Sequence, residues 1–298
     1  PKLQWEPANA WVGDDVANNT DRGTPILARF ARWWIARQPE TNVLLKPDTS
    51  WYSENQSTFT LTKPEELLGF SLLATEKTFK NQTIKLGKDI QLNKVDGTTL
   101  AAWQTGIIPE NVWTSVGTEG RTFQGTFDGQ GYTISGLYVK GTSYQGMFGY
   151  VDKACVVRDF KLVDSYIEGS GNYIGVIGYL YGDCDSIYTD AIINAKAGSG
   201  YVGGIVGRWR GQCSSYSQAL YENSAPQQTI SNCWFNGQIL LASGVNFAGG
   251  ITSELFSNGV YNFENCLVTG TIEGSTVAEV GGIYSYDQSS CQIHLKNC

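Results

Sequence analysis

The sequence predicts an all-β chain folded as a right-handed parallel β-helix, a solenoid with about 30 residues per coil. A glycine-centred motif recurs from residue 144 to the end, at Gly146, Gly175, Gly204, Gly250 and Gly282. These glycines are separated by 29, 29, 46 and 32 residues. A second series follows the same spacing, at Asp159, Asp190, Asn232, Asn265 and Asn297. Each series has one long interval, Gly204 to Gly250 in the first and Asp190 to Asn232 in the second. The two intervals overlap, so one insertion, placed in Gly211–Gln228, explains both.

The apolar residues between these markers come in short bursts, such as Ile239–Leu241, separated by Gly, Asn, Ser and Asp. Bursts of this length are typical of strands rather than helices. Connections this short within a constant period favour a coil of three short parallel strands. Neighbouring coils would lie about 4.8 Å apart, so that equivalent residues stack on one another.

Composition supports this fold class and excludes several functions. The chain has 35 glycines in 298 residues, and 16% of its residues are charged against 41% hydrophobic. The net charge of −7 argues against nucleic-acid binding. No apolar run is long enough to span a membrane. With one histidine and no cysteine pair at metal-ligand spacing, we predict no zinc site and no cofactor. Seven cysteines do not suit a disulfide scaffold.

Two helices are predicted before the repeats. Residues 1–50 form an arm in which Thr24-Pro25 begins a helix with Trp33 and Trp34 on its apolar side. This arm is predicted to dock on the chain itself or on a partner. Residues 51–298 form the β-helix, and a second helix begins at the capping box Thr62–Glu65 and covers the first coil. The alternating segment Thr83–Leu92 is then predicted to be a strand.

The Asp/Asn series predicts a ladder of side-chain hydrogen bonds between coils. The structural ladder residues are Asn232, Asn265 and Asn297, each followed by a cysteine, at Cys233, Cys266 and Cys298. In-register stacking gives these three thiols similar directions. We therefore expect them to form a buried, reduced column in the core.

Several acidic residues are candidates for catalytic or metal-binding groups. Asp159 and Asp190 hold equivalent positions one coil apart, which suits the carboxylate pair of a glycoside hydrolase. The alternative is that both are ladder residues. Asp183 and Asp185, in a predicted loop, could bind a cation such as calcium or belong to a solvated turn. Asp128 is predicted to form an Asx turn.

Aromatic residues are the main candidates for ligand binding. Tyr144, Tyr173 and Tyr201 recur at the same place in successive coils, followed by Phe247, and Trp209 begins the insertion. Exposed aromatic side chains bind sugar rings by apolar contact while their polar groups remain hydrated. The alternative is a purely structural stack along the solenoid.

The run Phe123–Leu137 and the following Gly-Gly-Ile repeats resemble the GLUG-motif proteins, over about residues 51–298. Ser253 and Ser285 depart from the pattern, which has glycine there. The resemblance implies a bacterial surface or secreted β-helix, often from Bacteroides-like bacteria. Such proteins include adhesin-like chains and large surface proteases in which the repeats are not the catalytic part.

These observations leave three hypotheses. The first is a non-enzymatic surface or extracellular structural protein, adhesin-like, that presents a rigid β-helical rod to a glycan or a host or cell-surface protein. The second is a carbohydrate-active enzyme, including a phage-type depolymerase, on the same fold. The third is a subunit of a head-to-tail extracellular filament that assembles through residues 1–50.

Overall fold

The computed structural model describes residues 43–213, 226–274, 277–288 and 291–298. The chain divides into two units, Pro1–Thr41 and Asn42–Cys298. The predicted arm helix therefore lies outside the described residues. The unit from Asn42 onward is a parallel β-helix, as the repeat predicts.

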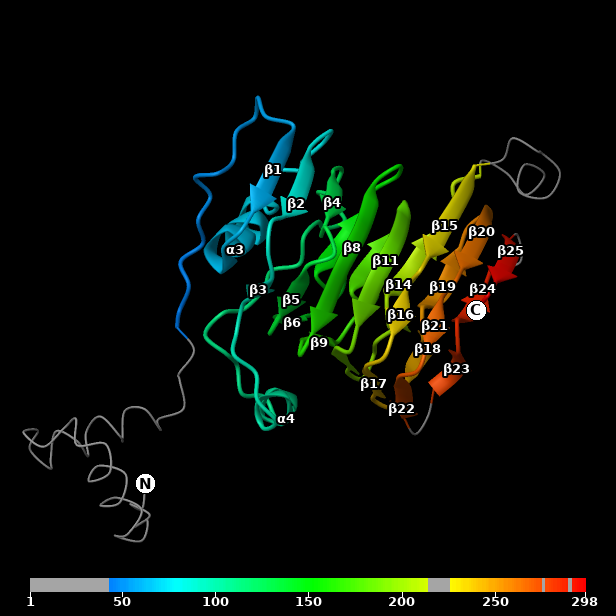
Figure 1. The fold of residues 1–298 in the computed structure, drawn as a ribbon. Helices are drawn as coiled ribbons and strands as arrows, with labels where there is room; N and C mark the ends of the chain where they lie inside the picture. Colours follow the sequence, from blue (N-terminus) through cyan, green and yellow to red (C-terminus); the bar gives the residue numbers. More distant parts are fainter. Residues whose placement is uncertain (1–42, 214–225, 275–276, 289–290) are drawn as a thin grey trace, which may run out of the picture. The chain divides into compact units, whose positions relative to one another are not determined.

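The β-helix consists of four parallel sheets that run along its axis (Figure 1). The 12-stranded sheet contains β1 (Thr58–Leu61), β2 (Thr83–Leu86), β3 (Ile90–Gln91), β4 (Thr126–Asp128), β5 (Thr133–Ser135), β8 (Val156–Val163), β11 (Asp183–Thr189), β15 (Gln227–Ser231), β16 (Trp234–Phe235), β20 (Gly259–Glu264), β21 (Leu267–Val268) and β25 (Cys291–Lys296). One five-stranded sheet contains β7 (Phe148–Val151), β10 (Ile177–Leu180), β14 (Val206–Arg210), β19 (Thr252–Phe256) and β24 (Tyr284–Asp287). The other contains β6 (Tyr138–Gly141), β9 (Tyr166–Gly169), β12 (Ile192–Ala195), β17 (Gln238–Leu241) and β22 (Thr271–Gly274). The fourth sheet has three strands, β13 (Tyr201–Gly203), β18 (Val245–Gly249) and β23 (Val277–Gly281).

A complete coil contains more strands than the three predicted. The coil that starts at β15 passes through β16, β17, β18 and β19 before β20 begins the next one. Asn232, with a φ of 52°, turns the chain between β15 and β16, and Gly244, with a φ of 83°, turns it before β18. These left-handed positions divide each apolar burst into shorter strands. Burst length in the sequence does not reveal the corners, so the predicted count of three was wrong.

The coil that begins with β11 carries one extra residue between β13 and β14. Tyr201 lies 28 positions after Tyr173, its stacking neighbour, whereas Val206 lies 29 positions after its partner Ile177. The additional residue falls in Gly203-Gly204, where β13 ends and the chain turns toward β14. Gly175 therefore lies opposite Gly203 when the register is counted from Val202, which pairs with Ile174, and opposite Gly204, its predicted equivalent, when it is counted from Val206.

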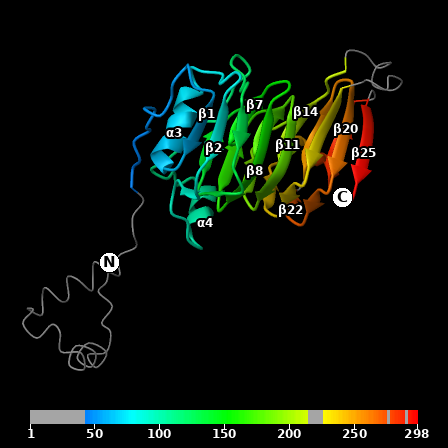
Figure 2. The same cartoon turned by 45° about the horizontal axis from the view of Figure 1, so that its top comes forward.

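The first coil is covered by a helix, α3 (Pro64–Leu73), which lies beside β1 at one end of the β-helix (Figure 2). Phe70 is fully buried, and its ring lies 5.0 Å from Phe79 and 6.0 Å from Phe127. The carboxylate that caps the helix belongs to Glu66, whose Oε2 accepts hydrogen bonds from the backbone N–H groups of Thr62 and Lys63. The predicted capping box, with Glu65 as its acid, was shifted by one residue.

Residues 43–50 belong to this body rather than to the arm. The Leu45 N–H donates to Asn111 Oδ1 at 2.8 Å, and the Asp48 N–H donates to the Glu65 carbonyl at 2.8 Å. The boundary between arm and β-helix therefore lies at Thr41, not at residue 50.

The segment after the cap differs from its prediction in two ways. The strand expected over Thr83–Leu92 is divided into β2 and β3 by a turn at Gly87. A short helix that the sequence did not reveal, α4 (Thr99–Gln104), packs Trp103 against Tyr138 with ring centroids 5.4 Å apart. It covers the outer face of β6.

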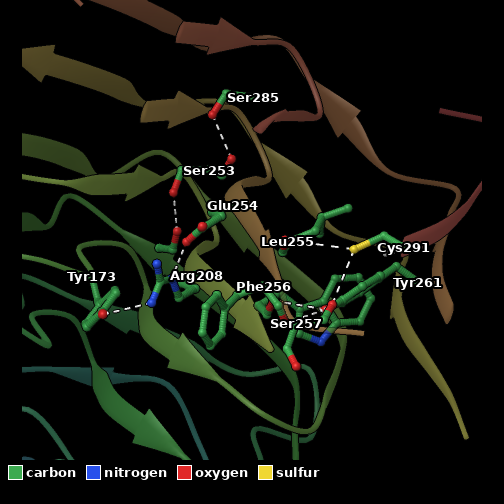
Figure 3. Close-up of polar contacts among 12 residues, drawn as sticks. Tyr173, Arg208, Ser253, Glu254, Leu255, Phe256, Ser257, Tyr261, Ser285 and Cys291 are labelled. Atoms are coloured by element: carbon green, nitrogen blue, oxygen red, sulfur yellow. Dashed lines mark hydrogen bonds and ion pairs between the residues drawn. The ribbon is translucent and has the colours of Figure 1, made fainter. Parts of the chain in front are cut away.

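A column of small residues allows close approach of successive coils. Gly149, Gly178 and Gly207 are followed in register by Ser253 and Ser285. A Cβ on Gly207 would lie 2.5 Å from the Gly178 carbonyl oxygen, so no side chain fits there. In the next two coils the serine hydroxyl makes use of this closeness: Ser253 Oγ donates to the Gly207 carbonyl, and Ser285 Oγ donates to the Ser253 carbonyl at 2.6 Å (Figure 3). The departure from the glycine pattern thus adds a hydrogen bond between coils.

Candidate functional site

The predicted tyrosine column forms a continuous stack parallel to the solenoid axis. The ring centroids of Tyr144 and Tyr173 lie 4.8 Å apart, those of Tyr173 and Tyr201 5.5 Å, and those of Tyr201 and Phe247 5.4 Å. Tyr286 extends the stack, 4.7 Å from Phe247. The spacing follows from the register of the parallel coils, which places equivalent side chains about 4.8 Å apart.

A second row, on the neighbouring sheet, packs against this stack. Tyr150, Tyr179, Arg208, Glu254 and Tyr286 are in register on β7, β10, β14, β19 and β24. Tyr179 lies 5.1 Å from Tyr173, and Tyr150 lies 5.8 Å from Tyr144, between ring centroids. We call the two rows together the aromatic strip; its members are Tyr144, Tyr150, Tyr173, Tyr179, Tyr201, Arg208, Phe247, Glu254 and Tyr286.

Arg208 joins the two rows of the strip. Its guanidinium lies 4.0 Å from the Tyr201 ring centroid and 4.9 Å from that of Tyr173, and Nη1 donates to the Tyr173 hydroxyl at 2.9 Å (Figure 3). Its Nε donates to Glu254 Oε2. Both side chains of this ion pair are buried, at 9% and 1% exposure. A buried charge requires a paired opposite charge, so the pair fixes the position of the guanidinium among the rings.

Burial controls the ionisation of the strip. It raises the pKa of the Tyr144 hydroxyl to about 12, so this group is a neutral hydrogen-bond donor at physiological pH. Burial also raises the pKa of Glu254, although the Arg208 guanidinium opposes this effect. The strip thus combines partly buried rings with an ion pair whose two charges compensate each other.

Trp209 is not part of this surface. Alternation along β14 directs its side chain inward, between Arg208 and Arg210. The indole is fully buried, donates from Nε1 to the Gly182 carbonyl at 3.0 Å, and packs edge-on against Tyr261 and Phe263. Its prediction as a ligand-binding residue was wrong, because the sequence register of β14 was not recognised. Most of the predicted insertion Gly211–Gln228 lies outside the described residues; Gln228 is buried within β15.

The Asn ladder lies at a solvent-facing corner. Asn265 Nδ2 donates to Asn232 Oδ1 at 3.0 Å, and Asn297 Nδ2 donates to Asn265 Oδ1 at 3.1 Å. Asn232 Nδ2 donates in turn to Asp185 Oδ1 at 2.7 Å. All three asparagines have φ values of 52–55°, the left-handed region that asparagine tolerates better than most residues.

Asp190 does not belong to this corner. The registers of Arg158 with Asp185 and of Phe160 with Ile187 place Ser186, with a φ of 53°, opposite Asp159. Asp190 lies four residues further on, where its Oδ1 accepts from the Asp164 N–H at 2.9 Å. The proposed pairing of Asp159 with Asp190 as equivalent carboxylates one coil apart was therefore wrong.

Other carboxylates surround Asp159. Arg158 Nη2 lies 2.9 Å from Asp128 Oδ2, and its Nε lies 3.6 Å from Asp159 Oδ2. Burial opposes ionisation of Asp128, but hydrogen bonds from Gln130 and Arg158 outweigh it and lower its pKa. Burial, with the nearby Asp128 and Asp185, raises the pKa of Asp159. Two adjacent carboxyls thus have pKa values displaced in opposite directions.

The proposed cation ligands Asp183 and Asp185 lie in strand β11 and not in a loop. Asp183 Oδ1 accepts from the Thr229 N–H at 2.8 Å, and Asp185 Oδ1 accepts from the Ser231 hydroxyl at 2.6 Å. Their oxygens thus bind the next coil. Over the part of the chain that the structure describes, no group of three His, Cys, Asp or Glu side chains is arranged to hold a metal ion.

The cysteine column is buried in two of its three members. Cys233 and Cys266 are 0% and 2% exposed, whereas Cys298 is exposed, and all three are free thiols. The expectation that Cys298 is buried was wrong, because no described coil covers it. Burial raises the pKa of Cys266 to about 12. Such a thiol remains protonated and unreactive.

One polar cluster does not follow from the sequence motifs. Glu168, on β9, has a nearly buried side chain that accepts a hydrogen bond from the Tyr166 hydroxyl at 2.7 Å. Lys140 and Lys196, one coil to either side, lie 2.9 and 3.2 Å from its oxygens. Burial opposes its ionisation, but these three groups outweigh it and lower its pKa. Lys140 and Asn194 are the strand partners of Glu168, and Lys196 lies two residues after Asn194. Only this residue-by-residue alignment of three coils reveals that both lysines reach one carboxylate.

Comparison with known proteins gives a fold and no family. No family model matches the chain, so the GLUG resemblance remains a prediction. The crystal structure of a protein described as "a putative immunoglobulin A1 protease", from Bacteroides ovatus, is similar with a TM-score of 0.52 and 16% identity, over 83% of this chain and 75% of that one. At this identity the likeness shows the fold alone. The similar structure comes from a Bacteroides species, a source that the resemblance in the sequence also suggested.

Two sequence relatives are much longer proteins. A "Putative Gly-rich membrane protein" of Evansella cellulosilytica is 32% identical over 80 residues, 25% of this chain and 9% of that protein. Halomucin of Haloquadratum walsbyi is 25% identical over 188 residues, 61% of this chain and 2% of that protein. The chain thus spans less than a tenth of either relative. Of its own helices, none among the described residues is long and apolar enough to cross a membrane.

Proposed function

We propose that this chain is a non-enzymatic, adhesin-like binding module of an extracellular or cell-surface protein. Its β-helix is a rigid support, and the aromatic strip is the surface that contacts a glycan or a protein of the host or of another cell. Halomucin and the Bacteroides ovatus protein support this proposal by analogy only. The chain covers a small part of Halomucin, and it shares only the fold of the Bacteroides ovatus protein.

The observation that carries the proposal is the construction of the strip. Tyrosine and arginine are enriched in binding surfaces, where they contribute much contact area for little loss of side-chain entropy. Here the rings are already fixed by stacking, and Arg208 is fixed by Glu254. Because the rings cover one another, a ligand would contact their edges and hydroxyls. Successive coils repeat this contact along the axis, which suits a long ligand.

The test compares the chain with its Tyr144→Phe/Tyr201→Phe double variant. Phenylalanine keeps the stack and removes only the hydroxyls. A Tyr132→Phe variant, outside the strip, is the matched control. Binding to immobilised polysaccharides and to purified extracellular matrix proteins is measured by biolayer interferometry. We expect a loss of affinity of roughly tenfold in the double variant, with unchanged melting. Equal affinity of all three proteins for every retained partner would refute the proposal.

A carbohydrate-active enzyme, including a phage-type depolymerase, is the second candidate. It is favoured by the opposite pKa displacements of Asp128 and Asp159, the pattern of a paired base and acid in glycoside hydrolysis. Arg158, however, binds Asp128, which leaves that carboxylate poorly placed as a base. Release of reducing ends from a polysaccharide, abolished by Asp159→Asn but not by Asp190→Asn, would establish this activity in place of the first proposal.

Head-to-tail filament assembly through residues 1–50 is the third candidate. The residues that would dock, 1–42, lie outside the described part of the chain, so the idea depends on the tryptophan-rich sequence of the arm. Light scattering of the chain with and without residues 1–41 tests it. Assembly that disappears on deletion supports a filament. An unchanged mass, with an unchanged melting temperature, would show that the arm is a passive linker.

A further inference from the structure

A second aromatic surface lies on the 12-stranded sheet, which does not carry the aromatic strip. Tyr188 on β11, Trp234 on β16 and Leu267 on β21 are in register in three successive coils. Trp234 is 41% exposed and Leu267 48%. Single exposed apolar residues are ordinary, but an aligned row with a tryptophan at its centre is typical of a binding surface.

The tryptophan is held in place by hydrogen bonds within its own coil and the next. Trp234 Nε1 donates to Thr269 Oγ1 at 2.7 Å, and the Thr269 hydroxyl donates to Asn236 Oδ1 at 2.6 Å. The Asn236 amide donates to the Tyr188 hydroxyl at 3.4 Å. Tyr188 also packs edge-on against the indole, with ring centroids 5.0 Å apart. We call these five residues, Tyr188, Trp234, Asn236, Leu267 and Thr269, the Trp234 platform.

This network decides what the platform can bind. The indole N–H, its only polar group, is already satisfied by Thr269, so the exposed part of the ring offers apolar contact. Asn236 and Thr269 are exposed beside it and have amide and hydroxyl groups. Because the side chains are fixed before binding, little entropy is lost when a ligand is seated. A flat apolar surface beside amides and hydroxyls matches the C–H face and the hydroxyl rim of a pyranose ring.

The spacing and the charges narrow the ligand class. Coils repeat about every 4.8 Å, close to the length of one pyranose unit, so a saccharide chain parallel to the axis would meet one coil per sugar. Thr189 pairs with Phe235, so the residues that follow them, Asp190 and Asn236, lie opposite each other in neighbouring coils. A carboxylate therefore lies next to the platform. The chain as a whole carries −7. Lys161, in register with Tyr188 one coil away, balances the Asp190 carboxylate locally, so it is the net charge of the chain that disfavours an anionic saccharide.

We propose that the Trp234 platform binds a neutral polysaccharide that lies along the solenoid axis. Trp234 contacts the sugar face, and Asn236 and Thr269 bind hydroxyls. The inference depends on the proposed function only for the exposure of the module to extracellular glycans. It concerns a different sheet from the aromatic strip and names the ligand class.

The experiment measures binding of the full chain to three soluble polymers, a β-glucan, a mannan and the acidic polygalacturonate, by affinity electrophoresis and calorimetry. Trp234→Ala removes the platform's ring, Trp234→Phe restores part of it, and Thr269→Val keeps the shape but removes the acceptor of the indole N–H. Ile108→Ala, at an apolar residue of the described chain that is more exposed than Trp234, is the control. Melting curves verify that each variant is folded.

We expect a neutral polymer to bind, with affinity reduced roughly tenfold in Trp234→Ala, less in Thr269→Val and Trp234→Phe, and not in Ile108→Ala. Neutral binding that is unchanged in Trp234→Ala, or binding of polygalacturonate alone, would overturn the inference. The two proposals fail separately. Binding that depends on Trp234 but not on the Tyr144→Phe/Tyr201→Phe change refutes only the strip, and the reverse refutes only the platform.

Discussion

Replacement of Asn265 by alanine tests the corner ladder, and with it the register of the coils. Asn265 donates to Asn232 and accepts from Asn297, and its backbone has a φ of 55°. The side chain is exposed, so each hydrogen bond contributes about 0.5 kcal/mol, at the lower end of the usual range. Alanine in the left-handed region adds a cost of about 1–2 kcal/mol. The variant should therefore lose about 2–3 kcal/mol of unfolding free energy.

Asn265→Gly separates the two contributions. It loses the same hydrogen bonds and avoids the left-handed strain, although it gains freedom in the unfolded chain worth about 0.5–1 kcal/mol. The expected loss is about 1.5–2 kcal/mol, smaller than for alanine. Asn246→Ala, at an exposed asparagine of β18 with ordinary strand backbone, is the control and should stay within about 0.5 kcal/mol of the parent.

The assay is urea unfolding followed by circular dichroism, in which midpoints are compared at constant slope. A solenoid that unfolds in more than one step would show it as a change in slope between variants. Alanine and glycine variants of equal stability would show that the corner carries no backbone strain. If both unfold like the parent, the ladder contributes nothing and the argument fails.

Packing and charge between the coils give three further predictions. Gly207→Ala should prevent folding or strongly lower the melting temperature, because its Cβ would lie 2.5 Å from a carbonyl oxygen. Ser253→Ala, in the next coil, should lose only one hydrogen bond, about 1 kcal/mol. Equal melting temperatures of the two variants would contradict the close approach of the coils. Cys298 should react with a thiol reagent in the native state at once and Cys266 only on unfolding; rapid modification of both would contradict the proposed core. The pKa of Glu168 is lowered on folding, so its contribution to the unfolding free energy is complete above its ordinary pKa of 4.5 and is lost as the pH falls through the lowered value. Glu168→Gln should therefore make the melting temperature depend less on pH in that range. A variant whose melting temperature changes with pH in parallel with the parent would contradict the cluster.

The sequence predicted the architecture well because the strand register of a solenoid appears in the sequence as a constant spacing between equivalent residues. Equivalent residues must stack, so the spacing of Tyr144, Tyr173 and Tyr201 was enough to place them in one column. The prediction failed where local backbone geometry alters the count without altering the composition. The extra residue at Gly203-Gly204 and the corner residue Ser186 are such cases. Glycine and serine are both found in many backbone conformations, so the residue types do not reveal the extra residue or the corner. Only the pairing of neighbouring strands reveals them.

The surfaces were harder to predict than the core. The inward direction of Trp209 depends on strand alternation, which a single sequence leaves ambiguous when Arg208 and Arg210 flank it. Trp234 and Tyr188 were not recognised because they fall in different local motifs and meet only in register. The lysines at Glu168 were missed for the same reason. Pairs that form between coils are visible only when the coils are aligned residue by residue.

The proposed function is tested most directly by recording retention and cleavage together. The purified chain is incubated with an immobilised polysaccharide panel, and bound protein and newly released reducing ends are measured in the same samples over time. The account predicts retention that the Tyr144→Phe/Tyr201→Phe variant weakens, with no accumulation of reducing ends. Reducing ends that accumulate with time, and that disappear in Asp159→Asn, would contradict a non-enzymatic module.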